Sequence, residues 1–187
     1  MFKTWLRFQI FMVSLNLRTK KLLPAGGKSG ASNNMSNIII RRANQEDIEA
    51  LAGLLKELFS IEKDFIFDEN KQLCGLKMMM ENDNSRCIMV AEINKIVVGM
   101  CTAQILISTA EGGKAALIED VVVNENFKGQ GIGQLLMSSI EDWSISQDAK
   151  RLALLADRNN KIALEFYEAL KWNKTQLICL HKRACSE

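Results

Sequence analysis

A strand followed by a glycine-rich loop and a helix is the feature that most constrains the fold of this chain. The run AALIEDVVV at residues 115–123 is rich in β-branched and apolar residues, which is typical of a strand. The loop KGQGIG follows at 128–133, and Leu136, Ile140 and Trp143 then recur at helical spacing. A helix that begins at such a loop presents free backbone N–H groups, and glycine lets a phosphate approach them closely. The segment therefore predicts an α/β fold with an anion-binding turn.

Two other phosphate-binding motifs do not match this loop. The dinucleotide fingerprint G-x-G-x-x-G, begun at Gly129, requires a third glycine where the chain has Gln134. The Walker A pattern requires Gly-Lys followed by Ser or Thr, which the chain has only at residues 27–29, and the glycine needed five positions earlier is Leu22. A strand-to-helix turn without a ligand remains the alternative for the loop considered alone.

The flanking sequence predicts the remaining elements. Asn44 with Asp47 three residues later is typical of a helix start, and the helix should run to about Phe59. Further helices are expected at about 68–82 and 160–170, and further strands at 37–42, 87–93, 96–107, 151–156 and 175–182. Antiparallel strands followed by a β-α-β unit predict a mixed, mostly antiparallel sheet with helices on both faces.

Charge divides the chain into a basic leader and an acidic body. Six of the 24 Lys and Arg side chains lie in residues 1–36, which hold no Asp or Glu, so residues 37–187 carry 18 basic and 22 acidic side chains, a net charge of −4. The leader holds the only proline and ends in a Gly- and Ser-rich stretch that is typical of a linker. We expect 1–36 to lie outside the fold, as a segment upstream of a start at Met35, a targeting peptide or a surface-binding arm. Residues 37–187 would form one domain.

Composition excludes several classes of partner. The apolar part of the leader is too short and too polar to span a membrane. The body has no basic stripe with interleaved aromatic residues, so no nucleic-acid partner is expected. Its five cysteines match no zinc or redox spacing, and with a single histidine we expect a reduced, cytoplasmic protein without a metal. Cys179 and His181 share a face of a predicted strand, so a Cys/His dyad for acyl transfer has to be considered. Two-residue spacing within one strand seldom allows the hydrogen bond that such a dyad needs.

Two blocks of residues resemble the GNAT superfamily of acetyl-CoA-dependent N-acetyltransferases. The family signature, Arg or Gln followed by x-x-Gly-x-Gly or Ala after an apolar strand, is matched by Lys128, Gly131 and Gly133. The segment Asn-x-x-Ala-x-x-Phe-Tyr is matched by Asn160, Ala163, Phe166 and Tyr167. The chain departs from the pattern at Lys128, at Glu125, where proline is common, and at Lys171, where glycine is usual.

The resemblance implies a single domain with a V-shaped split in its sheet and acetyl-CoA as co-substrate. The pantetheine arm would receive main-chain hydrogen bonds from Val121, Val122 and Val123, and a side-chain hydrogen bond from Asn160. The pyrophosphate would be surrounded by Lys128, Gly129, Gln130, Gly131, Ile132, Gly133 and Gln134.

The implied reaction is direct attack of a primary amine on the acetyl thioester in a ternary complex. Tyr167 matches the family's general acid. Glu119 and Asp120 are the candidate bases, and because successive residues of a strand face opposite sides, at most one of them points at the substrate. Glu119 is favoured; the alternative is that both pair with surface cations or only set the strand edge. The net charge of the body favours a small cationic amine. Acetylation of a protein N-terminus or lysine, and a CoA-binding module without turnover, remain alternatives, and a homodimer is left open.

Overall fold

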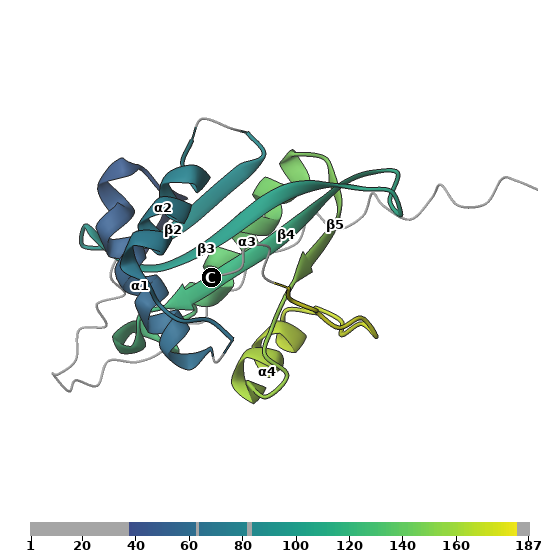
Figure 1. Cartoon of the computed structure of the whole chain (residues 1–187). Helices are drawn as coiled ribbons and strands as arrows, with labels where there is room; N and C mark the ends of the chain where they lie inside the picture. The colour runs from purple at the N-terminus through teal and green to yellow at the C-terminus, as the bar shows by residue number, and fades with distance from the viewer. Residues whose placement is uncertain (1–37, 63, 82–83, 183–187) are drawn as a thin grey trace, which may run out of the picture. The chain divides into compact units, whose positions relative to one another are not determined.

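A five-stranded sheet lies at the centre of the domain (Figure 1). The computed structural model describes residues 38–62, 64–81 and 84–182, so the expected leader lies outside the described residues. The strands follow chain order across the sheet: β1 (Ile39–Arg42), β2 (Arg86–Ile93), β3 (Ile96–Ser108), β4 (Gly113–Val123) and β5 (Ala149–Leu154). The first four pair antiparallel and β5 pairs parallel to β4, which confirms the mixed, mostly antiparallel sheet.

Helices cover both faces of the sheet (Figure 1). They are α1 (Ile48–Ile61), α2 (Glu69–Met79), α3 (Ile132–Ser146) and α4 (Lys161–Ala169), with two short 3₁₀ helices, η1 (Gln45–Asp47) and η2 (Glu125–Phe127). Strand alternation divides the apolar residues between two cores. Val90, Met100 and Val122 pack with α1 and α2, whereas Cys101 and Ile118 pack with α3.

The sheet splits between β4 and β5. Their parallel pairing runs from Lys114 with Ala149 to Ile118 with Leu154 and then ends, although β4 continues to Val123 with β3 as its partner. Figure 1 shows the two strands starting together and diverging, β4 passing behind α1 and β5 leading down to α4. This is the predicted V-shaped split, and past Ile118 one edge of β4 has no strand partner among the described residues.

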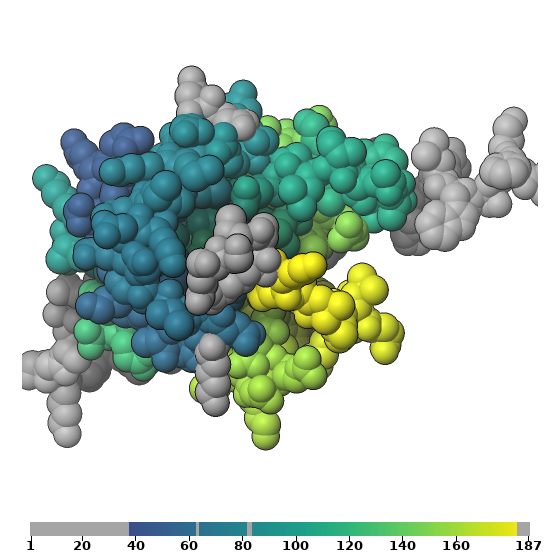
Figure 2. Space-filling view, in the orientation of Figure 1, coloured from purple at the N-terminus to yellow at the C-terminus, as the bar shows by residue number. Residues whose placement is uncertain are grey.

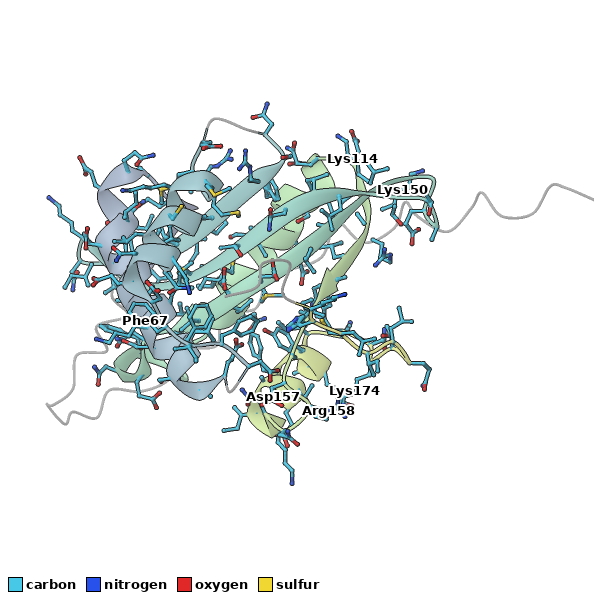
Figure 3. All side chains as sticks on the ribbon, viewed as in Figure 1. Phe67, Lys114, Lys150, Asp157, Arg158 and Lys174 are labelled. Atoms are coloured by element: carbon cyan, nitrogen blue, oxygen red, sulfur yellow. The ribbon has the colours of Figure 1, made fainter. Side chains whose placement is uncertain are left out.

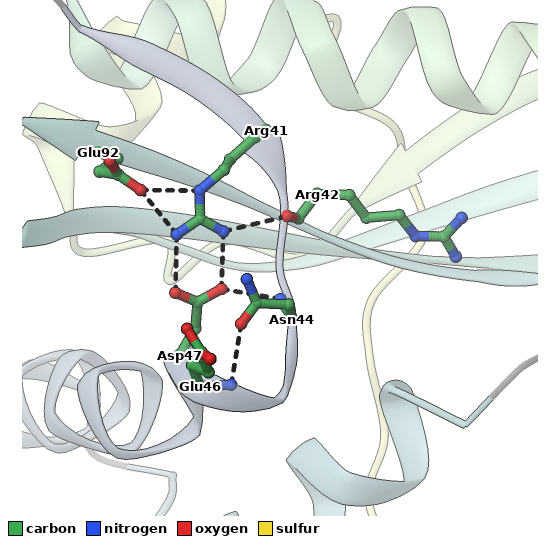
Figure 4. Close-up of polar contacts among 6 residues, drawn as sticks. All are labelled: Arg41, Arg42, Asn44, Glu46, Asp47 and Glu92. Carbon is green, nitrogen blue, oxygen red and sulfur yellow. Dashed lines mark hydrogen bonds and ion pairs between the residues drawn. The ribbon is translucent and has the colours of Figure 1, made fainter. Parts of the chain in front are cut away.

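The start of the domain is fixed by an ion-pair network at the end of β1 (Figure 4). Asn44 caps η1: its side chain accepts from the Glu46 N–H at 2.8 Å and its N–H donates to Asp47 at 2.8 Å, so the predicted cap is confirmed. Arg41 donates to both Asp47 oxygens at 2.7 and 2.8 Å and to Glu92 at 2.8 Å. The hydrogen bond to Arg41 holds the pKa of Asp47 below its usual range, and the pKa of Arg41 is raised.

One expected strand is wrong: residues 175–182 form none. The side chain of Thr175 instead accepts from the Leu177 N–H at 3.3 Å, and the chain bends at Gln176. Such local bonds compete with a strand when no neighbouring strand is paired to it. The bent segment also brings Cys179 Sγ within 3.2 Å of His181 Nε2, a contact that the expected strand spacing disfavoured. Figure 2 shows the segment in yellow beside α4.

Candidate active site

The glycine turn expected to bind an anion lies at the start of α3. Gly129 and Gly131 have φ of +75° and +80°, a backbone region that favours glycine. No other part of the described chain comes within 4 Å of the place where a Cβ would stand at either residue. Gly131 is the N-cap of α3 and provides no side chain to bond the first N–H groups of the helix. The turn therefore offers an open backbone cradle that an anion can approach.

Gly133, the second glycine of the signature, has a packing role. A Cβ on Gly133 would lie 3.2 Å from Cζ of Phe166 on α4, which is closer than ordinary van der Waals contact. Gly133 therefore allows α4 to approach α3 at the end of the split. Because Tyr167 follows Phe166, the same contact helps to fix the position of Tyr167.

The cation of the loop is already paired. Lys128 Nζ contacts the carboxylate of Glu125, three residues earlier in η2. Both side chains are more than one-third exposed. The two residues that depart from the family pattern near this loop thus interact with each other, and the positive charge of Lys128 is partly neutralised.

Strand β4 bulges beside the split. Met100 on β3 is opposite Val122, but Thr102, two residues later, is opposite Glu119, so β4 contains an extra residue at this point. Asp120 occupies the bulge with φ of +52°, and its Oδ2 accepts from the Thr102 hydroxyl at 3.1 Å. The bulge breaks the regular alternation of side chains from which only one of Glu119 and Asp120 was expected to face the substrate.

The environment of Asp120 makes its carboxyl group harder to ionise than that of an aspartate exposed to solvent. Burial raises its pKa to about 6, the charge of Glu119 acts in the same direction, and the hydrogen bond from Thr102 opposes both. At pH 7 the group is therefore mostly ionised and only weakly stabilised as the anion. A carboxylate in that condition is suited to accept a proton.

Carboxylates from three segments gather at the open end of the split. Glu62 follows α1, and its pKa is raised first by burial and then by the charges of Asp120, Asp157, Asp64 and Glu119. These five form the acidic cleft, and no ion pair to any of them is found in residues 38–62, 64–81 and 84–182. In Figure 3 Asp157 lies on the loop before α4, whereas Lys114 and Lys150 lie at the other end of β4 and β5.

Tyr167 lies on α4, near enough to Glu62 for the charge of that carboxylate to act on its pKa. Burial raises the pKa of Tyr167 to about 12, and the charges of Cys101 and Glu62 add to the effect. Its ring is 5.2 Å from that of Phe166 and 6.5 Å from that of Trp172, centroid to centroid. In the described part of the chain nothing hydrogen-bonds its hydroxyl group. The phenol is therefore protonated at neutral pH and free to donate.

The other residues expected to hold the coenzyme lie around the same split. Val121 to Val123 form the end of β4, where the edge away from β3 has no paired strand among the described residues. Asn160 caps α4 by accepting from the Ala163 N–H at 3.1 Å, so its carbonyl oxygen is engaged. The amide NH₂ of Asn160 has no partner within residues 84–182 or the other described ranges, and it can donate to a ligand.

A separate hollow of about 300 Å³ lies further along β3 and β4. It is bordered by the residues around the β3–β4 turn and by β5, namely residues 106–110, 115–117, Arg151 and Ala153. None of the five carboxylates of the acidic cleft lines it. Its arginine is paired with Glu111 at 3.0 Å.

Thr102, Glu62, Asp64 and Asp157 are the residues of this site that sequence reasoning missed. They come from three separate segments, and no short motif joins them. The turn Asp157-Arg158-Asn159-Asn160, which immediately precedes the matched segment, is the one local signal for Asp157. Within the described residues, the four cysteines Cys74, Cys87, Cys101 and Cys179 are free thiols, and burial raises the pKa of Cys87 to about 11. No helix in the described ranges combines the length and apolar character of a membrane span.

Known proteins are similar to this chain in sequence or in fold. An uncharacterized N-acetyltransferase from Archaeoglobus fulgidus is 27% identical over 130 residues, which cover 68% of this chain and 88% of that protein. The thialysine N-epsilon-acetyltransferase of Bos taurus is 27% identical over 147 residues, with 73% and 84% covered. The solved structure of aminoglycoside N-acetyltransferase AAC(6')-Iy with CoA has the same fold, with a TM-score of 0.69 at 19% identity over 88% of this chain and 100% of that chain.

A sequence model described as the acetyltransferase (GNAT) family matches residues 49–172, more than half of the chain. The matched range includes the glycine turn, the bulged strand and Tyr167. On this match, the protein belongs to the GNAT family of acetyltransferases.

Proposed function

We propose that the protein transfers the acetyl group of acetyl-CoA to a primary amine on a small cationic molecule, by direct attack in a ternary complex. The observation that carries the choice of acceptor is the acidic cleft beside Tyr167. Five carboxylates without ion pairs among the described residues repel one another: burial raises the pKa of Glu62, and the charges of the other four raise it further. A cationic acceptor would relieve that repulsion and would be concentrated by the negative potential.

Acetyl-CoA would bind across the split. The open cradle at Gly129 to Gly131 would hold the pyrophosphate on the N-terminus of α3. The unpaired edge of β4 at Val121 to Val123 would hydrogen-bond the pantetheine arm, with the Asn160 amide as a further donor. Residues 128–134 and the end of β4 would thus place the thioester beside the bulge.

Deprotonation of the amine is the first chemical requirement. An alkyl ammonium with a pKa near 10.4 is almost wholly protonated at pH 7, and removing its proton costs about 4.6 kcal/mol. We propose Asp120 as the acceptor of this proton, since its pKa of about 6 leaves it ionised but poorly stabilised. Glu119, opposite Thr102, is the second carboxylate within reach and remains the alternative base.

Acyl transfer then joins the amine nitrogen to the acetyl carbon and breaks the carbon–sulfur bond, and the nitrogen releases its second proton to solvent as the amide forms. Backbone N–H groups at Val121 or Val122 would polarise the thioester carbonyl. The Tyr167 hydroxyl would donate its proton to the departing CoA sulfur, and it would regain a proton from solvent. The products are the acetylated amine and free CoA.

Release of CoA thiol from acetyl-CoA tests this function. The protein would be assayed with monoamines, diamines, polyamines, aminoglycosides and amino acids, and with peptides carrying a free N-terminus or lysine. We expect turnover with the small cationic amines, and a KM for them that rises with salt because the cleft charges are screened. Turnover with peptides alone would redirect the proposal to protein acetylation. Calorimetric CoA binding with no thiol release for any amine would establish a binding module instead.

Single variants separate the two carboxylates. Asp120→Asn should lower kcat by about 100-fold or more if Asp120 takes the proton, because a positioned base contributes at least that much. Glu119→Gln should then act mainly on the KM of the acceptor. The reverse pattern would assign the base to Glu119.

A further inference from the structure

We propose that Thr102 is a positioning residue that holds the Asp120 carboxylate in the geometry and charge state needed to take the acceptor's proton. Thr102 lies on β3, not on the strand that carries the bulge. The inference rests on the proposed function and specifies how the base is held in place.

The two side chains meet across the β3–β4 ladder. Thr102 is only 4% exposed, and its hydroxyl donates to Oδ2 of Asp120 at 3.1 Å. The other oxygen of Asp120, Oδ1, has no partner among the described residues. No buried side-chain oxygen or nitrogen there lacks a hydrogen bond, so Oδ1 must be accessible to solvent. One oxygen is thus held by the protein while the other faces outward.

The backbone explains why such support is needed. Asp120 adopts a left-handed conformation, with φ of +52°, inside an otherwise extended strand. Aspartate tolerates this conformation better than most residues, but the bulge removes Asp120 from the regular ladder. Thr102 is β-branched and therefore stiff about χ1, and it sits on a strand that is paired on both sides. The Thr102 hydroxyl is therefore held in a fixed direction, and it donates to Asp120, whose backbone is less regular.

The electrostatic surroundings give the hydrogen bond a second effect. The titratable groups that interact electrostatically with Asp120 are Glu119 on its own strand, Cys101 on β3 and Glu62 at the end of α1. None of these is a cation. In residues 38–62, 64–81 and 84–182, the Thr102 hydroxyl is the one side-chain donor found on Asp120. A donor stabilises the ionised carboxylate, so its removal should keep Asp120 protonated to higher pH.

The test is the pH dependence of kcat/KM in wild type, Thr102→Val and Thr102→Ser, with the amine that gives the best turnover. Using one amine throughout cancels the titration of the amine itself. In Thr102→Val the acidic limb should move up by about one pH unit, because a hydrogen bond to a charged group is worth about that much. Activity should fall about fivefold at pH 6, by close to tenfold at lower pH, and by much less above pH 8. Thr102→Ser keeps the hydroxyl and should restore the limb.

Three comparisons make the result specific. Thr175→Val removes an exposed hydroxyl outside the cleft and should leave the profile unchanged. Thermal unfolding shows whether each variant is folded, and Thr102→Ala replaces Thr102→Val if the valine does not fit. An acidic limb that stays in place in folded Thr102→Val and Thr102→Ala, while wild type turns over normally, would overturn the inference. Absence of turnover in wild type with every amine would overturn the proposed function instead.

Discussion

Tyr167 is a phenol placed where a proton must reach the CoA sulfur. Its raised pKa of about 12 means that it does not ionise in the working range, so it can donate at any pH near neutrality. We expect Tyr167→Phe to lower kcat by about 100-fold, with KM for acetyl-CoA changed by less than about twofold. Steady-state kinetics from pH 6 to 9 measures both, and the melting temperature serves as the control for folding. Full turnover across this range would remove Tyr167 from the mechanism.

Lys128 and Glu125 form a local pair at the anion-binding turn. Releasing Lys128 from its partner should strengthen its attraction to the coenzyme pyrophosphate. We therefore expect Glu125→Gln to lower the KM for acetyl-CoA by about twofold to fivefold at low salt, since exposed pairs are worth at most about 1 kcal/mol. The effect should vanish at high ionic strength. Glu49→Gln, on the exposed first turn of α1, is the matched control, and equal KM values for all three proteins would contradict the role of the pair.

Among the elements, α3 and α4 depend on one small residue. A Cβ at Gly133 would press on Phe166, whereas at Gly53, in the middle of α1, it would meet nothing within 4 Å. Alanine at either site gains helix propensity of about 1 kcal/mol. Gly53→Ala should therefore raise stability with unchanged activity. Gly133→Ala should gain less and lose activity severalfold, because α4 carries Tyr167. Denaturant unfolding and kcat measure this, and identical behaviour of the two variants would refute the packing role.

Elements with local signals could be predicted from the sequence. The capped start at Asn44, the glycine turn and the helix with Tyr167 are each encoded within about ten residues. The strand expected at 175–182 could not be judged in this way, because a strand forms only when another strand pairs with it. The bulge at Asp120 likewise depends on how β3 and β4 align. Thr102, more than fifteen residues away in sequence, therefore escaped notice, as did Glu62.

Across the whole molecule, carboxylates have two opposite effects on stability. The pKa of Asp47 is lowered by Arg41, so its contribution is present above the unfolded-state pKa near 3.8 and is lost as pH falls through the lower folded value. The pKa values of Asp120 and Glu62 are raised, so their ionisation destabilises the fold as pH rises. The first network fixes the start of the domain, whereas the second lines the cleft. Stability is thus reduced where the proposed chemistry requires charge.

Asp120→Asn tests this opposition between stability and activity. The amide keeps an oxygen that can accept from Thr102 but carries no charge. With a folded pKa of about 6 against 3.8, ionised Asp120 destabilises the wild type at pH 8 by about 1 to 3 kcal/mol, and Asp120→Asn should be more stable by that amount. The difference should shrink between pH 6 and 4, as Asp120 is protonated in the wild type. Urea unfolding at pH 4, 6 and 8 measures it, with Asp142→Asn, at an exposed position of α3, as control. A variant that is less stable than wild type at pH 8 would show that the charge of Asp120 is compensated within the fold, and the cleft would then need no cation.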